Sequence, residues 1–379
     1  MMSKSTARRY IFVFTAILFF ALAVPSHDAA AGGKRSWAEL VQSLSEPGGF
    51  FDSDNFVSNE SSYLTIVPRM RELGIRGGVY IGVGPDQNFS YLTQIRPEQA
   101  IIIDIRRQNL LQHLLFKALM ERARSRLEYL SLLFAKPVKL PSDLGKSLSA
   151  EQLVEAIDKV PGDPEVYRKN LEWVQSHIAR KYRLSLSHQD WELLKYIYKN
   201  FYEEDLDIRY RSYGREFQWR YPTFRMLILE RDVNHQLGNY MATEDDFLWL
   251  KRFQEEDRLV PVVGDLAGKV AMRNIARYLK DNRKLVRAFY VSNVEFYLIR
   301  NGVFEGYVDN VRALPVDDRS IFIRSYFGYG MPHPEQVQPY WMTSLMQYIR
   351  SFLQQQDISP YYSYRDLAVR DFISIKQEP

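Results

Sequence analysis

Two short apolar runs, the first ending in glycines and the second in an acid, constrain the fold of this chain more than any other feature. Residues 78–84 read Gly-Val-Tyr-Ile-Gly-Val-Gly, and residues 100–104 read Ala-Ile-Ile-Ile-Asp. A helix-length segment, residues 88–96, separates them, and apolar residues at helical spacing follow Asp104. The order predicts a strand, a glycine turn, a helix and a second, parallel strand, which together form a βαβ unit.

The ends of these two predicted strands carry residues that suit a ligand. Gly82 and Gly84 let the backbone approach a bound molecule closely. Asp104 follows Gly84 by about 20 residues, the interval at which an acid accepts hydrogen bonds from ribose hydroxyls. The pattern therefore predicts a nucleotide or nucleoside site. The alternative is that the glycines only make a tight turn and that Asp104 caps the following helix.

Strand-like and helix-like segments continue to alternate towards the C-terminus. The apolar runs at residues 259–265, 285–291, 320–327 and 369–375 are predicted as strands. Helices are predicted at residues 243–256, 269–280 and 341–353 and from residue 295 onwards. This alternation predicts an α/β protein with a Rossmann-like, mostly parallel sheet and helices on both faces.

A helical insertion is expected to interrupt the α/β pattern at residues 136–213. Three helix starts within it have legible caps at Ser149, Asp163 and Ser187. Residues 127–134, just before it, fit either a helix or a short strand. The predicted organisation is a first half of the Rossmann-like domain at residues 34–135, the insertion, and a second half at residues 214–379.

The segment before the first strand is expected to begin with a short helix at residues 37–44. The polar residues 58–61 are expected either to be exposed or to line a site. The segment as a whole is therefore predicted to be a cover over the ligand or a plain surface lead-in.

The first 33 residues have the pattern of an export signal. Basic Lys4, Arg8 and Arg9 precede an apolar run at residues 11–24, and small residues at 29–31 offer a cleavage site. The run is shorter than the ~20 residues that span a bilayer. The body of the chain is predicted to be exported to the periplasm or secreted, and possible attachment to a membrane is confined to an uncleaved N-terminal segment.

Composition excludes several classes of site. The formal net charge of +4 implies no polyelectrolyte partner, and acids balance the basic and aromatic residues between 209 and 225, so nucleic acid is not an expected partner. With no cysteine the chain has no disulfides and no zinc–thiolate or iron–sulfur sites. Six scattered histidines show no metal-ligand spacing, so no metal site is predicted.

The motifs at the strand ends resemble those of class I S-adenosylmethionine-dependent methyltransferases. Residues 82–84 match the first motif and Asp104 the acid after the second strand. Residues 263–266 are similar to the third-strand motif, and residues 290–293 fall where the fourth strand ends. More narrowly, residues 82–89 and 104–109 resemble an uncharacterised bacterial family with such a methyltransferase-like core.

The resemblance implies roles for individual residues. S-adenosylmethionine, a nucleoside-type small molecule, would be the cofactor, with Asn293 and Tyr290 facing the substrate and Glu295, or else Asp86, as a base. Arg106 and Arg324 would pair with a carboxylate or phosphate of the ligand. The residues expected to bind the cofactor are Gly82, Gly84, Asp86, Asn88, Asp104, Arg106 and Asp265.

The sequence departs from the methyltransferase pattern in two places. Pro85 and Asp86 stand where a third glycine is usual, and the fourth strand lacks the Asn-Pro-Pro-Tyr type of ending. S-adenosylmethionine is also a cytoplasmic metabolite, whereas an export signal is predicted. An exported methyltransferase-like enzyme and a non-catalytic, envelope-associated binding protein on a degenerate methyltransferase core are therefore both retained. A nicotinamide-dependent oxidoreductase is disfavoured because the third glycine and a Tyr–Lys pair are missing.

Overall fold

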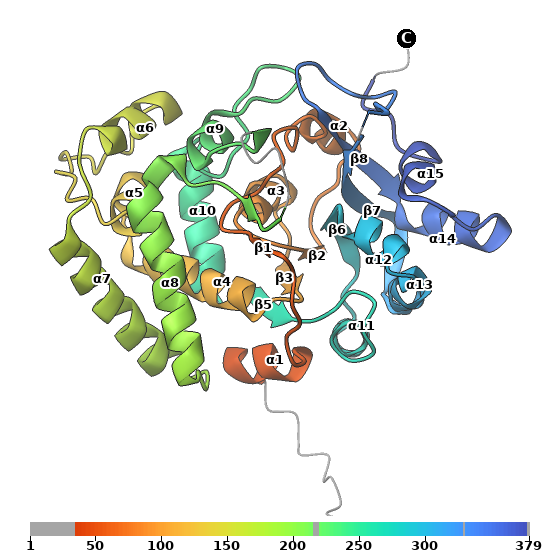
Figure 1. Ribbon diagram of the computed structural model, residues 1–379, viewed down its shortest axis with the longest axis horizontal. Coiled ribbons are helices and arrows are strands. Elements are labelled where there is room, and N and C mark those ends of the chain that lie inside the picture. The colour runs from red at the N-terminus through yellow and green to blue at the C-terminus, as the bar shows by residue number, and fades with distance from the viewer. Residues whose placement is uncertain (1–34, 215–219, 329, 377–379) are drawn as a thin grey trace, which may run out of the picture. The chain divides into compact units, whose positions relative to one another are not determined.

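A six-stranded sheet forms the centre of the fold in the computed structural model, which describes residues 35–214, 220–328 and 330–376 (Figure 1). The strand order is β5-β3-β2-β6-β7-β8. The first five strands in this order pair in parallel, and β8 pairs antiparallel to β7 at one edge. The predicted α/β fold with a mostly parallel sheet is therefore confirmed. The strands are β2 (Val79–Gly82), β3 (Gln99–Asp104), β5 (Leu259–Val263), β6 (Val286–Ser292), β7 (Val316–Phe327) and β8 (Met342–Tyr348).

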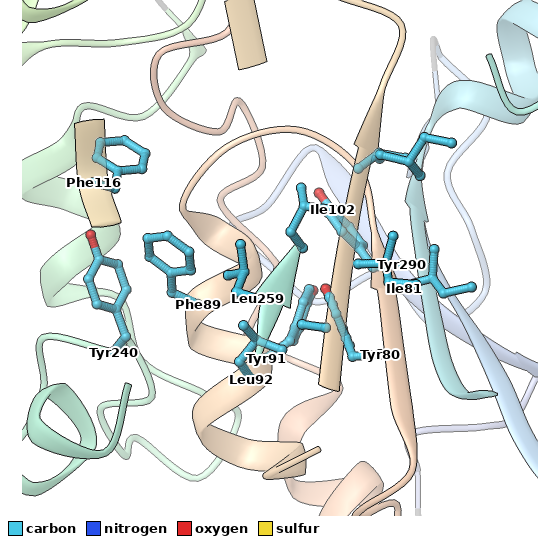
Figure 2. Packing of buried hydrophobic residues seen from close by; sticks show 14 of the residues in the cluster. Tyr80, Ile81, Phe89, Tyr91, Leu92, Ile102, Phe116, Tyr240, Leu259 and Tyr290 are labelled. Carbon is cyan, nitrogen blue, oxygen red and sulfur yellow. The ribbon is translucent and has the colours of Figure 1, made fainter. Parts of the chain in front are cut away.

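Helices cover both faces of the sheet, so its parallel strands are mostly apolar and largely buried. Every residue of β2 and β5 is buried. Figure 2 shows Ile81 of β2 and Ile102 of β3 within this core, near Phe89, which makes edge contacts with Phe116 and Tyr240. Burying a side chain of this size stabilises the fold by about 1.5–3 kcal/mol.

Two groups of helices pack on the two faces of the sheet (Figure 1). One face carries α3 (Gln87–Ile95) and α4 (Arg107–Arg122), and further helices of the β3–β5 connection pack against α4. The other carries α11 (Ala271–Asp281), α12 (Val294–Arg300) and α13 (Phe304–Ala313). The remaining helices outside the long β3–β5 connection are α1 (Trp37–Leu44), α2 (Val67–Glu72), α14 (Ile349–Ile358) and α15 (Tyr364–Val369).

The connection from β3 to β5 is mainly helical. Its predicted N-caps at Ser149, Asp163 and Ser187 are confirmed, since each side chain accepts a backbone hydrogen bond from the first turn of its helix. Residues 127–134, left open between helix and strand, are helical. The elements are α4 (Arg107–Arg122), α5 (Arg126–Leu133), α6 (Ala150–Asp158), α7 (Pro164–His177), the π-helix η1 (Ile178–Tyr182), α8 (His188–Glu204), the 3₁₀ helix η2 (Asp205–Asp207), β4 (Arg211–Ser212), α9 (Phe224–Leu229) and α10 (Glu244–Glu255).

The C-terminal part differs from the sequence-based prediction. Residues 341–353, predicted as one helix, form β8 followed by α14, which begins at Ile349. Residues 369–375, predicted as a strand, contribute one isolated bridge between Ile373 and Met346. The Met, Leu and Gln residues of β8 are compatible with either structure, and pairing with the long strand β7 decides the outcome.

Within the described ranges, no helix is both long and apolar enough to span a bilayer. The export signal predicted for residues 1–33 lies outside the described residues.

A two-stranded ribbon joins the N-terminal segment to the β3–β5 connection. It pairs β1 (Ser53–Asp54) with β4. The buried Asp54 carboxylate anchors it, accepting hydrogen bonds from the Tyr196 hydroxyl at 2.8 Å, the Gln108 amide at 2.9 Å and the Tyr213 hydroxyl. The Asp54 side chain thus joins the N-terminal segment to segments about 150 residues later in the sequence.

We expect Asp54→Ala to loosen this ribbon, because three donors lose a common acceptor. The free energy of unfolding should fall by about 1–3 kcal/mol, and amide hydrogen exchange should accelerate in β1 and β4. Asp207→Ala is the control, since that side chain is 71% exposed. Unchanged exchange at the ribbon in Asp54→Ala would contradict the anchoring role.

Candidate functional site

A cavity of about 840 Å³ lies at the carboxyl ends of the parallel strands. The chain-order positions of the strands across the sheet are 3-2-1-4-5-6, so the direction of winding reverses between β2 and β6. In open α/β sheets, ligands bind outside the carboxyl ends of the strands at such a point. Residues that follow β2, β3, β5, β6 and β7 all line the cavity, among them Gly84, Asp104, Asp265, Asn293 and Gly328.

The two predicted glycines have different roles. Gly84 lines the cavity and has a left-handed backbone with φ of 80°, which favours glycine. Gly82 is outside the cavity lining. A Cβ atom at Gly82 would lie 2.0 Å from the Asn88 side-chain oxygen and 2.6 Å from the Tyr80 ring. Gly82 is therefore required by packing inside the βαβ unit, a correction to its predicted contact with a ligand.

Buried side chains behind the turn hold its shape. The Asn88 amide donates to the carbonyl oxygens of Val83 at 2.9 Å and Pro85 at 2.7 Å. His113 Nε2 lies 3.0 Å from the Gly84 carbonyl oxygen, and because a carbonyl only accepts, Nε2 carries the proton. Burial lowers the pKa of His113 to about 4, so the ring stays neutral. Asn88, predicted to bind the cofactor, instead supports the turn that lines the cavity.

Asp86 also points away from the cavity. Its carboxylate is buried and accepts a 2.9 Å hydrogen bond from the Tyr240 hydroxyl, while Oδ1 has no hydrogen-bond partner among the described residues. Burial raises its pKa to about 7. The predicted roles of Asp86 in binding the cofactor or acting as a base are therefore corrected, because the carboxylate is enclosed behind the glycine turn.

Asp104 lines the cavity but already has a cationic partner. The Arg106 guanidinium donates to its two carboxylate oxygens at 3.0 and 2.8 Å, and the Arg106 backbone N–H donates at 2.9 Å. Arg106 also donates to the Ser53 hydroxyl and carbonyl oxygens, each at 3.1 Å. Arg106 thus orients the acid and fastens the N-terminal segment over it, so any ligand shares Asp104 with Arg106.

The turn after β5 brings Asp265 into the cavity lining. Asp265 Oδ1 accepts from the Ala267 N–H at 2.9 Å. The Glu46 carboxylate, from the N-terminal segment, accepts from the backbone N–H groups of Asp265 at 2.7 Å and Ala271 at 3.1 Å. Glu46 therefore fixes this turn, a role that sequence reasoning missed because the two segments are far apart along the chain.

The end of β6 presents Tyr290, Ser292 and Asn293 to the cavity. That Tyr290 and Asn293 face a substrate stays a prediction. Ser292 has a left-handed backbone with φ of 53°, which is unusual for a residue other than glycine. The Tyr290 hydroxyl accepts from the Gln87 amide at 3.0 Å, and burial followed by the charge of Glu60 raises the Tyr290 pKa.

Glu60 is the acid that lies next to Ser292 in the cavity lining. It was not among the predicted site residues. Its side chain is fully buried, lines the cavity, and accepts from the Gln87 amide at 2.9 Å and from the Ser292 hydroxyl. Of the two expectations for residues 58–61, exposure or a place in the lining, the second holds for Ser58, Asn59 and Glu60. The signal in the sequence was the polar run at residues 58–61 within a segment that precedes the first strand.

Glu295, predicted as a base, lies outside the cavity lining. It is fully buried and paired with Arg324, whose Nη2 donates to Glu295 Oε1 at 3.1 Å, and the Tyr307 hydroxyl donates at 2.9 Å. The carboxylate is neutralised in the core, and Arg324 is not available to an anionic ligand. Both predictions are corrected by this ion pair, which links α12 to β7.

A family assignment covers most of this architecture. The chain belongs to the family described as a domain of unknown function, DUF7790. Its model matches residues 55–190 and 166–372. No curated protein matches the chain.

The DUF7790 match includes Glu60, the glycine turn, Asp104, Asp265 and the end of β6, so each acid that lines the cavity in the described part of the chain falls within it. Within the described part of this DUF7790 chain, no cluster of three or more His, Asp or Glu side chains could hold a metal ion.

We expect Asp86→Asn to change how stability depends on pH. The folded-state pKa of about 7 lies above the ordinary value of 3.8. The protonated form is therefore favoured by folding, and stability is lost as pH rises from about 4 through 7. Asparagine mimics the protonated acid, so the variant should gain about 2–3 kcal/mol relative to the parent between pH 5 and pH 8.

Urea unfolding at both pH values measures this difference. Asp318→Asn is the control, because the Asp318 side chain is 84% exposed and should give no pH-dependent gain. A constant difference between Asp86→Asn and the parent at the two pH values would show that Asp86 is ionised throughout.

Proposed function

We propose that the cavity binds a nucleoside-type small molecule, with S-adenosylmethionine as the cofactor of a methyltransferase-like reaction on an unknown substrate. One observation carries the proposal. The turns after three neighbouring strands contribute Gly84, Asp104 and Asp265 to one cavity at the point where the strand order reverses. Its volume of about 840 Å³ is within the range of small-molecule sites.

Each of these residues suits one part of a nucleoside. Gly84 has no side chain, so a ligand can approach the backbone there. Asp104, oriented by Arg106, offers remaining lone pairs to the ribose hydroxyls. Asp265 would accept from the exocyclic amine of adenine, with Ile105 and Leu266 supplying apolar surface nearby in the lining.

The substrate would lie beside Tyr290 and Asn293. Methyl transfer mainly requires that the nucleophile be held in line with the methyl group and that a proton be accepted. Because the pKa of Tyr290 is raised, its hydroxyl stays protonated and acts by hydrogen bonding. Asn293 can orient a polar group through its amide.

The second candidate is a non-catalytic, envelope-associated binding protein on a degenerate methyltransferase core. The Asp104–Arg106 pair favours it, because three donors from Arg106 already occupy the acid that would recognise ribose. Export would favour it too, since S-adenosylmethionine is made in the cytoplasm. Among the described residues of the lining there is no Tyr–Lys pair of the kind that an oxidoreductase would need.

We expect the protein to bind S-adenosylmethionine or S-adenosylhomocysteine, and Asp265→Asn to weaken binding about 10-fold or more. Asparagine keeps the Oδ1 acceptor for Ala267 but turns an amide donor towards the adenine amine. Isothermal titration calorimetry measures both affinities. The exposed Asp281→Asn is the control. Absence of heat with either ligand, well above micromolar concentration, would contradict the nucleoside proposal.

We further expect the native protein to lack its first 30 or so residues and to be found outside the cytoplasm. N-terminal sequencing of the mature protein, with fractionation of the cells, tests this expectation. Full-length protein in the cytoplasm would contradict export and remove the main objection to an S-adenosylmethionine-dependent enzyme.

A further inference from the structure

Glu60, like Asp54 and Asp86, is a buried acid with no ion pair among the described residues, and of these three only Glu60 lines the cavity. Glu295 is paired with Arg324, and Asp104 with Arg106. Glu60 is just as buried, yet its hydrogen-bond donors are the neutral Ser292 hydroxyl and Gln87 amide. No described Lys, Arg or His forms an ion pair with it, and it faces a cavity, whereas Glu295 faces packed side chains.

A buried carboxylate without a counter-charge is costly. Transfer of an ion from water into a protein interior is unfavourable unless an opposite charge and hydrogen bonds compensate. The two neutral donors satisfy one lone pair on each oxygen of Glu60 and leave the others open. The missing counter-charge is therefore expected to come from whatever enters the cavity.

The tyrosine hydroxyls around Glu60 are neutral. Burial and the charge of Glu60 raise the pKa values of Tyr80, Tyr91 and Tyr290, so these hydroxyls remain neutral. The ring of Tyr290 lines the cavity, and aromatic faces attract cations.

The backbone at Ser292 is a second, independent indication. Its φ of 53° places a serine in a conformation that costs of order 1 kcal/mol or more, and such conformations cluster at functional sites. Here the conformation accompanies a hydrogen bond from the Ser292 hydroxyl to Glu60, across 232 residues of sequence. The strained turn thus fixes the direction of the carboxylate at the end of β6.

We propose that Glu60 binds a primary alkylammonium group of the ligand. Such a group donates three hydrogen bonds, which the open lone pairs of Glu60 and the side-chain oxygen of Asn293 can accept. The ammonium belongs either to the amino-acid end of a nucleoside cofactor or to an amine that is the second substrate. The inference rests on the proposed function in taking the cavity as the ligand site, and it does not require the nucleoside.

The test compares three probes by calorimetry on the full-length protein and on Glu60→Gln. S-adenosylhomocysteine has both a nucleoside and an ammonium group, 5′-methylthioadenosine has the nucleoside alone, and 1,4-diaminobutane has the ammonium alone. Glutamine at position 60 can still accept from Ser292. Gln87 Oε1, which has no hydrogen-bond partner in the parent, can accept from the amide nitrogen that the substitution introduces at position 60, so the variant should fold. Its thermal unfolding temperature should be no lower than that of the parent, because the substitution removes a buried charge without a counter-charge, and Asp318→Asn is the control for net charge.

We expect an ammonium-bearing probe to bind the parent about 10-fold or more tightly than Glu60→Gln, while 5′-methylthioadenosine is unaffected. A Glu60-dependent preference for S-adenosylhomocysteine over 5′-methylthioadenosine assigns the ammonium to the cofactor. Glu60-dependent binding of 1,4-diaminobutane in the presence of 5′-methylthioadenosine assigns it to a second substrate. Glu60→Asp should restore part of the affinity, because it restores the charge.

Equal affinity of the parent and a folded Glu60→Gln for every ammonium-bearing probe overturns the inference, and the nucleoside proposal survives if 5′-methylthioadenosine still binds. Binding of 1,4-diaminobutane alone, dependent on Glu60, retains the ammonium site and contradicts the nucleoside. Absence of binding by all three probes overturns both.

Discussion

The parallel pairing of β2 with β3 on one side and with β6 on the other is the constraint on which the rest of the structure depends. Gly82 is in register with Ile102 of β3 and Tyr290 of β6, so the three carboxyl ends lie side by side. The chain leaves β2 for α3 on one face of the sheet and leaves β6 for α12 on the other (Figure 1). The cavity opens where these two directions part. Gly84, Asp104, Tyr290 and Asn293 reach it from the ends of these strands, whereas Glu60 reaches it from the N-terminal segment.

The buried acids near this point fall into two electrostatic groups. Asp104 and Glu295 are neutralised by arginines. The Glu295–Arg324 pair links α12 to β7, and Arg106 in addition donates to Ser53 of the N-terminal segment. Asp86 and Glu60 have neutral hydrogen-bond donors instead. For Asp86, which is enclosed behind the glycine turn, the cost of burial appears as a raised pKa. Glu60 faces the cavity, where a ligand can provide the charge that the protein does not.

Local signals accounted for much of the fold. The apolar runs of β2, β3, β5, β6 and β7 and the caps at Ser149, Asp163 and Ser187 were recognisable because strand burial and helix capping depend on residues close in sequence. The segment from Met342 was mistaken for a helix because its residues suit both structures and only pairing with β7 separates them. Tertiary contacts decided the site in the same way. The sequence did not predict that the Asp86 and Asn88 side chains, which follow the glycine turn, point away from the cavity.

By itself, the sequence determined that the two strands of a βαβ unit end near Gly84 and at Asp104, and that Tyr290 and Asn293 lie at the end of a later strand. The tertiary structure decided the rest, turning Asp86 and Asn88 away from the cavity, giving Arg106 to Asp104 and bringing Glu60 to Ser292. The physical reason is distance along the chain. Periodicity and capping report neighbours within a few residues, whereas the partners of a buried charge are set by packing, and Ser292 lies 232 residues from Glu60.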